Sequence, residues 1–143
     1  IDGAKKCFYN LARAQLKKGQ LTKALDYYGK AIELDPKYAR ALAGYGATCL
    51  RMGELDRARR FLEEGVKLDR SLKAALANLG LLYYLTGKFD KAITMNKRTL
   101  KLDAAFRPAL LNLHQIHMAK GEREKAEEYA ERIRNLGGGW HGN

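Results

Sequence analysis

The chain has 143 residues, of which 46% are hydrophobic and 30% are charged, a balance typical of a globular domain rather than a disordered chain. No apolar run approaches the roughly 20 residues that a membrane-spanning helix needs, so we expect no transmembrane segment. The formal net charge of +11 favours anionic partners, although a merely solvated basic surface explains it equally well.

Apolar residues recur at helical spacing in eight segments. The predicted helices, in chain order, cover residues 5–17, 21–34, 39–51, 55–68, 73–85, 89–102, 107–119 and 123–135. Pro36 should end the second helix, because the residue before a proline is pushed out of the helical region. We expect Ser71 to cap the start of the fifth helix, and Pro108 to lie in the first turn of the seventh.

The eight segments form four repeats with a step of 34 residues (45−11, 79−45 and 113−79). A glycine recurs at this step between the two helices of each repeat, at Gly19, Gly53, Gly87 and Gly121. Alanine recurs in each second helix, at Ala24, Ala58, Ala92 and Ala126. The repeats cover about 5–38, 39–72, 73–106 and 107–140. Each glycine suits a helix end that requires a left-handed residue.

Aromatic, small and apolar residues stand at matching places in these repeats. They include Phe8, Leu11, Ala12, Tyr28 and Pro36 in the first repeat, Tyr45 and Gly46 in the second, Leu79, Gly80, Tyr83 and Phe89 in the third, and Leu110 and Leu113 in the fourth. The pattern resembles the tetratricopeptide repeat family. That resemblance implies an all-α, right-handed α-solenoid of four helix-turn-helix repeats in a single domain over residues 1–143.

The resemblance also implies that the first helix of each repeat lines a concave face, where extended peptides or partner helices lie. Asn10, Asn78 and Asn112 occupy one column of that face, and Gly44 is the gap in the column. An asparagine amide can donate to and accept from one peptide unit. The column is similar to the asparagine ladder of the intracellular O-GlcNAc glycosyltransferases, and it predicts a peptide-holding role. The alternative is that these asparagines are only solvated.

The remaining concave residues divide into a basic and an apolar group. The basic group lies in the first half of the chain and comprises Lys6, Arg13, Lys17, Arg40 and Arg51. The apolar group lies in the second half and includes Leu81, Tyr84, Leu85, Leu111 and Met118. A partner with an acidic segment and an apolar one would match both groups. The alternative is that Leu81 and Leu85 pack between repeats.

Chaperone-binding members of the family grip a chain-terminal carboxylate with paired basic residues and asparagines. The matching positions here hold Tyr9, Arg13, Gly44, Ala74 and Asn78, so only one basic side chain is present. We therefore do not expect that carboxylate clamp.

A pair of histidines, His114 and His117, lies on one helical face without further metal ligands at a suitable spacing. With Asn96 and Thr99 they predict a polar patch between the third and fourth repeats, which must be hydrogen-bonded or hydrated. We expect no metal and no cofactor. The second helix of the third repeat carries several lysines, but no stacking aromatic residues accompany them, so we expect no specific nucleic-acid binding.

No catalytic constellation or phosphate-binding loop is visible, so we do not expect an enzyme. The sequence favours a protein–protein interaction scaffold or adaptor that binds an extended peptide or a partner helix. The alternative is a targeting or substrate-recruiting module of a larger multidomain enzyme or secretion-type assembly. We expect the chain to be a piece of a longer protein, and an uncapped last repeat would also permit a homodimer.

Overall fold

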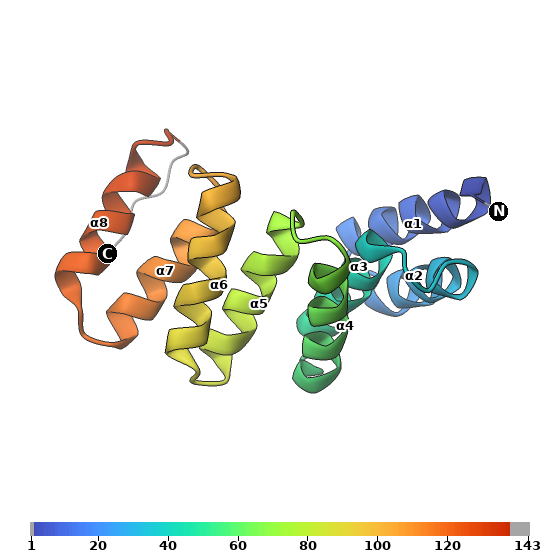
Figure 1. Ribbon diagram of the computed structural model, residues 1–143, viewed down its shortest axis with the longest axis horizontal. Helices are drawn as coiled ribbons and strands as arrows, with labels where there is room; N and C mark the ends of the chain where they lie inside the picture. The colour runs from blue at the N-terminus through green and yellow to red at the C-terminus, as the bar shows by residue number, and fades with distance from the viewer. Residues whose placement is uncertain (1, 138–143) are drawn as a thin grey trace. The chain divides into compact units, whose positions relative to one another are not determined.

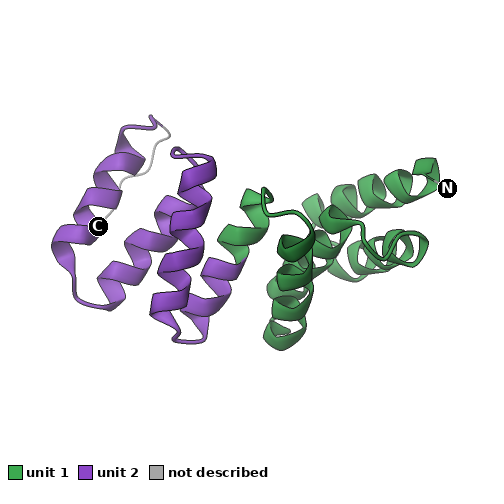
Figure 2. Ribbon diagram, viewed as in Figure 1, with its two compact units in different colours: residues 1–78 green, residues 79–143 purple. Residues whose placement is uncertain are grey.

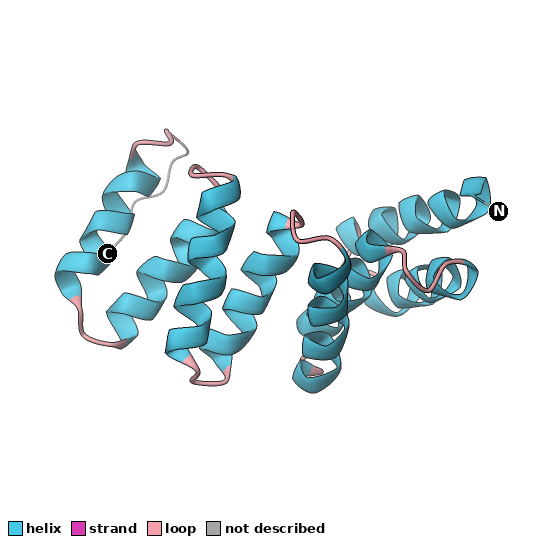
Figure 3. Cartoon of the chain, viewed as in Figure 1, coloured by secondary structure: helices cyan, strands magenta, loops and turns pink. Residues whose placement is uncertain are grey.

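The computed structural model describes residues 2–137, and within that range all regular secondary structure is α-helical (Figure 3). The helices are α1 Asp2–Lys17, α2 Leu21–Leu34, α3 Ala39–Arg51, α4 Leu55–Leu68, α5 Lys73–Leu85, α6 Phe89–Leu102, α7 Arg107–Ala119 and α8 Arg123–Arg134 (Figure 1). The predicted all-α solenoid of helical repeats is confirmed. The end of the fourth predicted repeat, residues 138–140, lies outside the described residues.

Six of the eight helices have the predicted bounds, and the two exceptions are the first and the last. Helix α1 begins at Asp2 rather than at residue 5, and its acidic first residue interacts favourably with the positive end of the helix dipole. Helix α8 ends at Arg134 rather than at residue 135. None of the described helices combines the length and apolarity that a bilayer crossing demands.

The glycine between the helices of each repeat has the left-handed backbone that the sequence predicts. Its φ angle is 77° at Gly19, 81° at Gly53, 77° at Gly87 and 75° at Gly121. In the first repeat the N–H of Gln20 then donates to the carbonyl of Gln15 at 2.9 Å, which satisfies an otherwise unpaired group at the helix end. A residue with a Cβ would be strained at these four positions.

The links between repeats are organised by an aspartate after each of the first three second helices. The carboxylates of Asp35 and Asp103 accept the backbone N–H two residues on, at 3.1 Å in both cases. Asp69 accepts both the N–H and the hydroxyl of Ser71, at 2.9 and 2.6 Å. The prediction that Ser71 caps α5 was therefore wrong, because its hydroxyl is bound to Asp69 and the helix begins only at Lys73.

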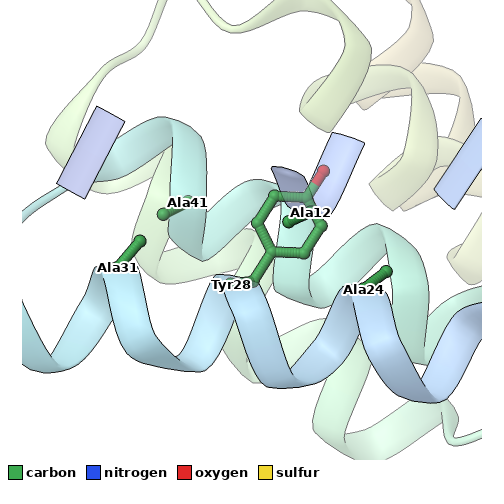
Figure 4. Close-up of a cluster of buried hydrophobic side chains, with 5 residues drawn as sticks. All are labelled: Ala12, Ala24, Tyr28, Ala31 and Ala41. Atoms are coloured by element: carbon green, nitrogen blue, oxygen red, sulfur yellow. The ribbon is translucent and has the colours of Figure 1, made fainter. Parts of the chain in front are cut away.

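By compactness the chain divides into two units, residues 1–78 and residues 79–143, with the boundary inside α5 (Figure 2). One buried cluster of the first unit consists of small side chains around one aromatic ring. These residues are Ala12, Ala24, Tyr28, Ala31 and Ala41 (Figure 4). The alanines allow α1, α2 and α3 to approach closely, and Phe8, Tyr9, Tyr27, Tyr38 and Tyr45 pack around them.

The core of the second unit combines large aliphatic side chains with buried polar ones. Leu82, Leu110, Leu113, Ile116 and Ile133 are fully or almost fully buried. Asn96, Thr99 and His117 are buried among the same helices. The first unit also buries large aliphatic side chains, Leu42, Leu62 and Leu76, and the polar Thr48, so the second unit differs mainly in its buried Asn96 and His117.

Candidate peptide-binding site

A cavity of about 380 Å³ lies within residues 1–78. Helix α1 contributes Tyr9, Arg13, Leu16 and Lys17, helix α3 contributes Arg40, Ala43, Gly44 and Ala47, and the segment from Ser71 to Asn78 closes the third side. Tyr28 reaches the cavity from α2. The volume lies within the range typical of ligand sites in proteins.

Three of the predicted basic residues, Arg13, Lys17 and Arg40, border this cavity. The Arg13 guanidinium lies 5.7 Å from the centre of the Tyr9 ring, which is within the range of a cation–π contact. No described carboxylate lies within ion-pair distance of any of the three, and no Asp or Glu lines the cavity. Lys73 also borders the cavity, so four basic and no acidic side chains line it. Asp69, two residues before the lining Ser71, interacts electrostatically with Arg40.

Tyr28 is the most buried polar residue of the cavity, with 2% of its surface exposed. Its ring stands on α2 within the alanine cluster, and its hydroxyl points away from that helix (Figure 4). Burial raises the pKa of Tyr28 to about 12, an effect that neighbouring Tyr9 increases and Arg13 opposes. Within residues 2–137 the hydroxyl has no hydrogen-bond partner.

Gly44 lies directly against Tyr28. A Cβ at Gly44 would be 2.5 Å from Tyr28 Cζ and 2.9 Å from the Tyr28 hydroxyl oxygen, too close for any side chain. The gap in the asparagine column is therefore a steric consequence of Tyr28, whose ring lies where a side chain at position 44 would begin.

The three asparagines of the predicted column have different surroundings. Asn78 lines the cavity, whereas Asn10 is exposed on α1 outside it. Asn112 belongs to the second unit, where its Nδ2 donates to Oδ1 of the buried Asn96 at 2.9 Å. Only Asn78 therefore lies with the basic residues, and the peptide-holding role of the column stays a prediction.

Two of the predicted basic residues lie outside the cavity. Lys6 is exposed on α1 and does not line it. The Arg51 guanidinium donates to the backbone carbonyl of Leu16 at 3.1 Å, so it extends from α3 to the end of α1. Arg51 thus contacts a helix that forms one wall.

The predicted apolar residues lie in the second unit and differ in exposure. Leu81, Tyr84 and Leu111 are half-buried, and the Tyr84 ring stacks on Phe89 with 5.9 Å between ring centres. Leu85 and Met118 are 54% and 46% exposed. Leu85 is therefore largely open to solvent rather than packed between repeats.

The predicted polar patch of the second unit is hydrogen-bonded, as its burial requires. Asn96 Nδ2 donates to the carbonyl of Ala92 at 2.8 Å, and the Thr99 hydroxyl donates to that of Met95 at 3.0 Å. Every side-chain nitrogen and oxygen atom in the described part of the chain that is completely shielded from solvent has a hydrogen-bond partner.

The two histidines of this patch contact different partners. His114 Nδ1 lies 3.1 Å from the carbonyl oxygen of Ala126, and His117 Nδ1 lies 2.9 Å from a carboxylate oxygen of Glu122. The hydrogen bond from His117 lowers the pKa of Glu122. Among residues 2–137, no group of three or more His, Cys, Asp or Glu side chains could hold a metal ion.

Sequence reasoning missed the role of Tyr28 in this site. Tyr28 fits the repeat pattern as a packing residue, so its place in the core was expected while its hydroxyl at the cavity was not. The signal was the glycine at position 44, in a column that otherwise holds asparagine. An interrupted column points to a neighbouring side chain that occupies the space.

The repeated helix pairs define an all-α solenoid of helical repeats, a class of interaction protein. Sequence models described as tetratricopeptide repeat match residues 15–79, and a second set matches residues 75–108 and 109–134. The chain therefore belongs to the tetratricopeptide repeat family. Such repeats form protein–protein interaction modules, and this chain is one of them.

Solved structures share the fold at low sequence identity. A crystal structure of MamA is 24% identical, with a TM-score of 0.79 over 90% of this chain and 75% of that one. The first TPR of Spaghetti (RPAP3), bound to the HSP90 peptide SRMEEVD, is 21% identical, with a TM-score of 0.79 over 85% and 96% of the two chains. The Arabidopsis OM64 TPR domain is 18% identical, with a TM-score of 0.77 over 82% and 97%. A comparison with curated proteins returns no match.

Proposed function

We propose that this chain binds an extended acidic segment of a partner protein in the cavity of its first unit. The observation that supports the proposal is the set of four basic residues, Arg13, Lys17, Arg40 and Lys73, around a cavity that no carboxylate lines. Charges of one sign in a partly enclosed site attract a ligand of the opposite sign and favour its correct orientation.

The other lining groups suit a peptide. Asn78 offers an amide that can donate to a peptide carbonyl and accept from a peptide N–H. Leu16, Ala43 and Ala47 provide apolar surface for the aliphatic parts of a ligand. Arginine is suited to carboxylate because its planar guanidinium can donate two parallel hydrogen bonds.

The RPAP3 domain offers a precedent on the same fold, since the peptide bound to it, SRMEEVD, contains three acidic residues. In this chain, Gly44 and Ala74 replace two of the polar positions that the family uses to hold a terminal carboxylate. We therefore propose an acidic segment within a chain rather than a chain end. A module that recruits a substrate to a larger enzyme would use the same site.

The test is a selection from a displayed library of random peptides, followed by affinity measurements on the selected peptides. The double variant Arg13→Gln, Arg40→Gln should bind them at least about tenfold more weakly, because each charged hydrogen bond contributes about 1.5–3 kcal/mol. The matched control is Lys97→Gln, Lys101→Gln, which removes the same charge from exposed positions of α6.

The control should stay within about twofold of the wild type, because a general loss of charge acts weakly at physiological salt. Equal weakening of both double variants would mean that net charge, rather than this cavity, attracts the peptides. Selected peptides without acidic residues would also contradict the proposal.

A further inference from the structure

We propose that the cavity of the first unit is a phosphate-binding subsite, in which Arg13, Arg40 and the Tyr28 hydroxyl hold a phosphorylated side chain of the bound segment. The inference rests on the proposed function and names the chemistry of the group that the cavity recognises. It follows from the unpaired hydroxyl of Tyr28, from the charge of the residues that line the cavity and from the contact between Tyr28 and Gly44.

The first observation is the unpaired hydroxyl of Tyr28. The residue is 2% exposed, its ring is held among alanines, and its hydroxyl has no hydrogen-bond partner within residues 2–137. Elsewhere in the chain, buried polar side chains such as Asn96 and Thr99 are hydrogen-bonded within the protein. A donor held without a protein partner at the edge of a cavity is suited to a ligand.

The second observation is the charge of the lining. Four basic residues, Arg13, Lys17, Arg40 and Lys73, and no carboxylate border the cavity. A carboxylate side chain carries one negative charge, whereas a phosphate monoester carries about 1.5 to 2 near neutral pH and has three strong acceptor oxygens. The dianion therefore balances the cations of this cavity more completely, and its oxygens can accept from two guanidinium groups and a hydroxyl together.

The third observation is the geometry that brings these donors together. The Arg13 guanidinium packs over the Tyr9 ring, and the neighbouring Tyr28 ring stands between α1 and α3. Gly44 allows this arrangement because any side chain there would meet the Tyr28 ring. A phenol that stays neutral at physiological pH, as the pKa of about 12 implies, donates to an oxyanion without repelling it.

The experiment is an NMR titration of the ¹⁵N-labelled chain with four probes at equal ionic strength. The probes are N-acetyl-phosphoserine amide, N-acetyl-phosphotyrosine amide, N-acetyl-glutamate amide and inorganic phosphate. We expect millimolar binding of at least one blocked phosphoamino acid, at least about fivefold tighter than the glutamate probe. The shifted signals should be the backbone amides of Tyr28, Gly44 and Asn78 and the side-chain Nε of Arg13 and Arg40.

Tyr28→Phe is the decisive variant, because it removes only the hydroxyl and keeps the buried ring. We expect it to weaken binding of the phosphorylated probe by about fivefold or more while leaving the melting temperature unchanged. If the hydroxyl had a purely structural role, the variant would lower the melting temperature and leave binding of the phosphorylated probe unchanged. Lys97→Gln is the control and should leave the titration unchanged.

Each contrary outcome has a distinct meaning. If the glutamate probe binds as tightly as the phosphorylated ones, the phosphate assignment is wrong while binding of acidic segments stands. Inorganic phosphate that binds as tightly as the blocked amino acids would show a site for a free anion instead of a side chain. Shifts spread over the lysines of α6 would indicate unspecific attraction and overturn the proposal.

Discussion

Asn78 and Asn112 occupy the same column of the repeat, yet the two units surround them differently. Asn78 lines an open cavity in the first unit. Asn112 donates its Nδ2 to the buried Asn96 in the second unit. The same residue at the same repeat position thus faces a cavity in one unit and a protein side chain in the other.

A second difference concerns one column of the second helices, which holds Tyr28 in the first unit and Asn96 in the second. Asn96 is separated from Asn112 by 16 residues, and Tyr28 is separated from Gly44 by the same number (44−28). In each case a side chain from a second helix meets the following first helix. The large Tyr28 requires a glycine opposite it and leaves a hydroxyl at the cavity, whereas the shorter Asn96 permits an asparagine and binds its amide. The residue in the second helix therefore decides whether an asparagine fits at position 44 and whether the Asn112 amide is already hydrogen-bonded.

The largest expected change in stability comes from adding a methyl group at Gly80, opposite Asn96, or at Gly44, opposite Tyr28. A Cβ at Gly80 would be 2.6 Å from Asn96 Cγ, and one at Gly44 would be 2.5 Å from Tyr28 Cζ. We expect Gly80→Ala and Gly44→Ala each to lower the free energy of unfolding by about 2–3 kcal/mol, because overpacking a filled core is costly. Urea denaturation measures this change.

Gly29→Ala is the matched control for those two variants. Its Cβ would meet only Tyr45, at an ordinary 4.0 Å, in the middle of α2. Alanine in an unobstructed helix is more stable than glycine by about 0.5–1 kcal/mol, so this variant should gain stability. If Gly80→Ala were as stable as Gly29→Ala, Asn96 would not define its surroundings as we describe.

The next effect concerns pH and separates Tyr28 from Asn96, which does not ionise. The pKa of Tyr28 is about 12 in the folded chain and near 10 in an unfolded one. The folded state therefore retains the proton more strongly. The protonated Tyr28 hydroxyl therefore contributes about 2 kcal/mol to the free energy of unfolding. This contribution is complete below about pH 10 and is lost as the pH rises from about 10 to about 12.

Chemical denaturation at pH 9 and at pH 11.5 measures this term. Burial also raises the pKa of Tyr38 and Tyr129, so the wild type is compared with Tyr28→Phe at both values. At the higher pH the wild type should lose more stability than Tyr28→Phe, because only the wild type has a hydroxyl that ionises at this position. An unchanged difference would mean that the Tyr28 hydroxyl ionises as freely as in the unfolded chain.

The smallest effect compares the two asparagines directly. Asn112→Ala removes a donor from the buried Oδ1 of Asn96 and should cost about 1 kcal/mol of stability. Asn78→Ala should change stability by less than about 0.5 kcal/mol, because Asn78 has no hydrogen-bond partner within the described residues. Thermal unfolding of the two single variants makes the comparison, and equal losses would contradict the distinction between the units.

The amino-acid sequence alone determined the helices and their turns. The 34-residue step, the inter-helix glycines and the apolar stripes are local signals, and a left-handed glycine or an amphipathic stripe has the same meaning in any context. The basic residues of the first repeats and the polar patch around Asn96 were also visible, because residue type and column suffice to predict them.

The tertiary structure alone decided which of these residues act together. Serine is a residue type that commonly caps helices, but the Ser71 hydroxyl donates to Asp69 instead. Arg13 and Arg40 border one cavity with Tyr28, while Arg51, from the same predicted group, contacts a helix end. These outcomes depend on side-chain lengths and directions across three helices, which no periodicity encodes, since a column assigns a residue to a face but not to a neighbour.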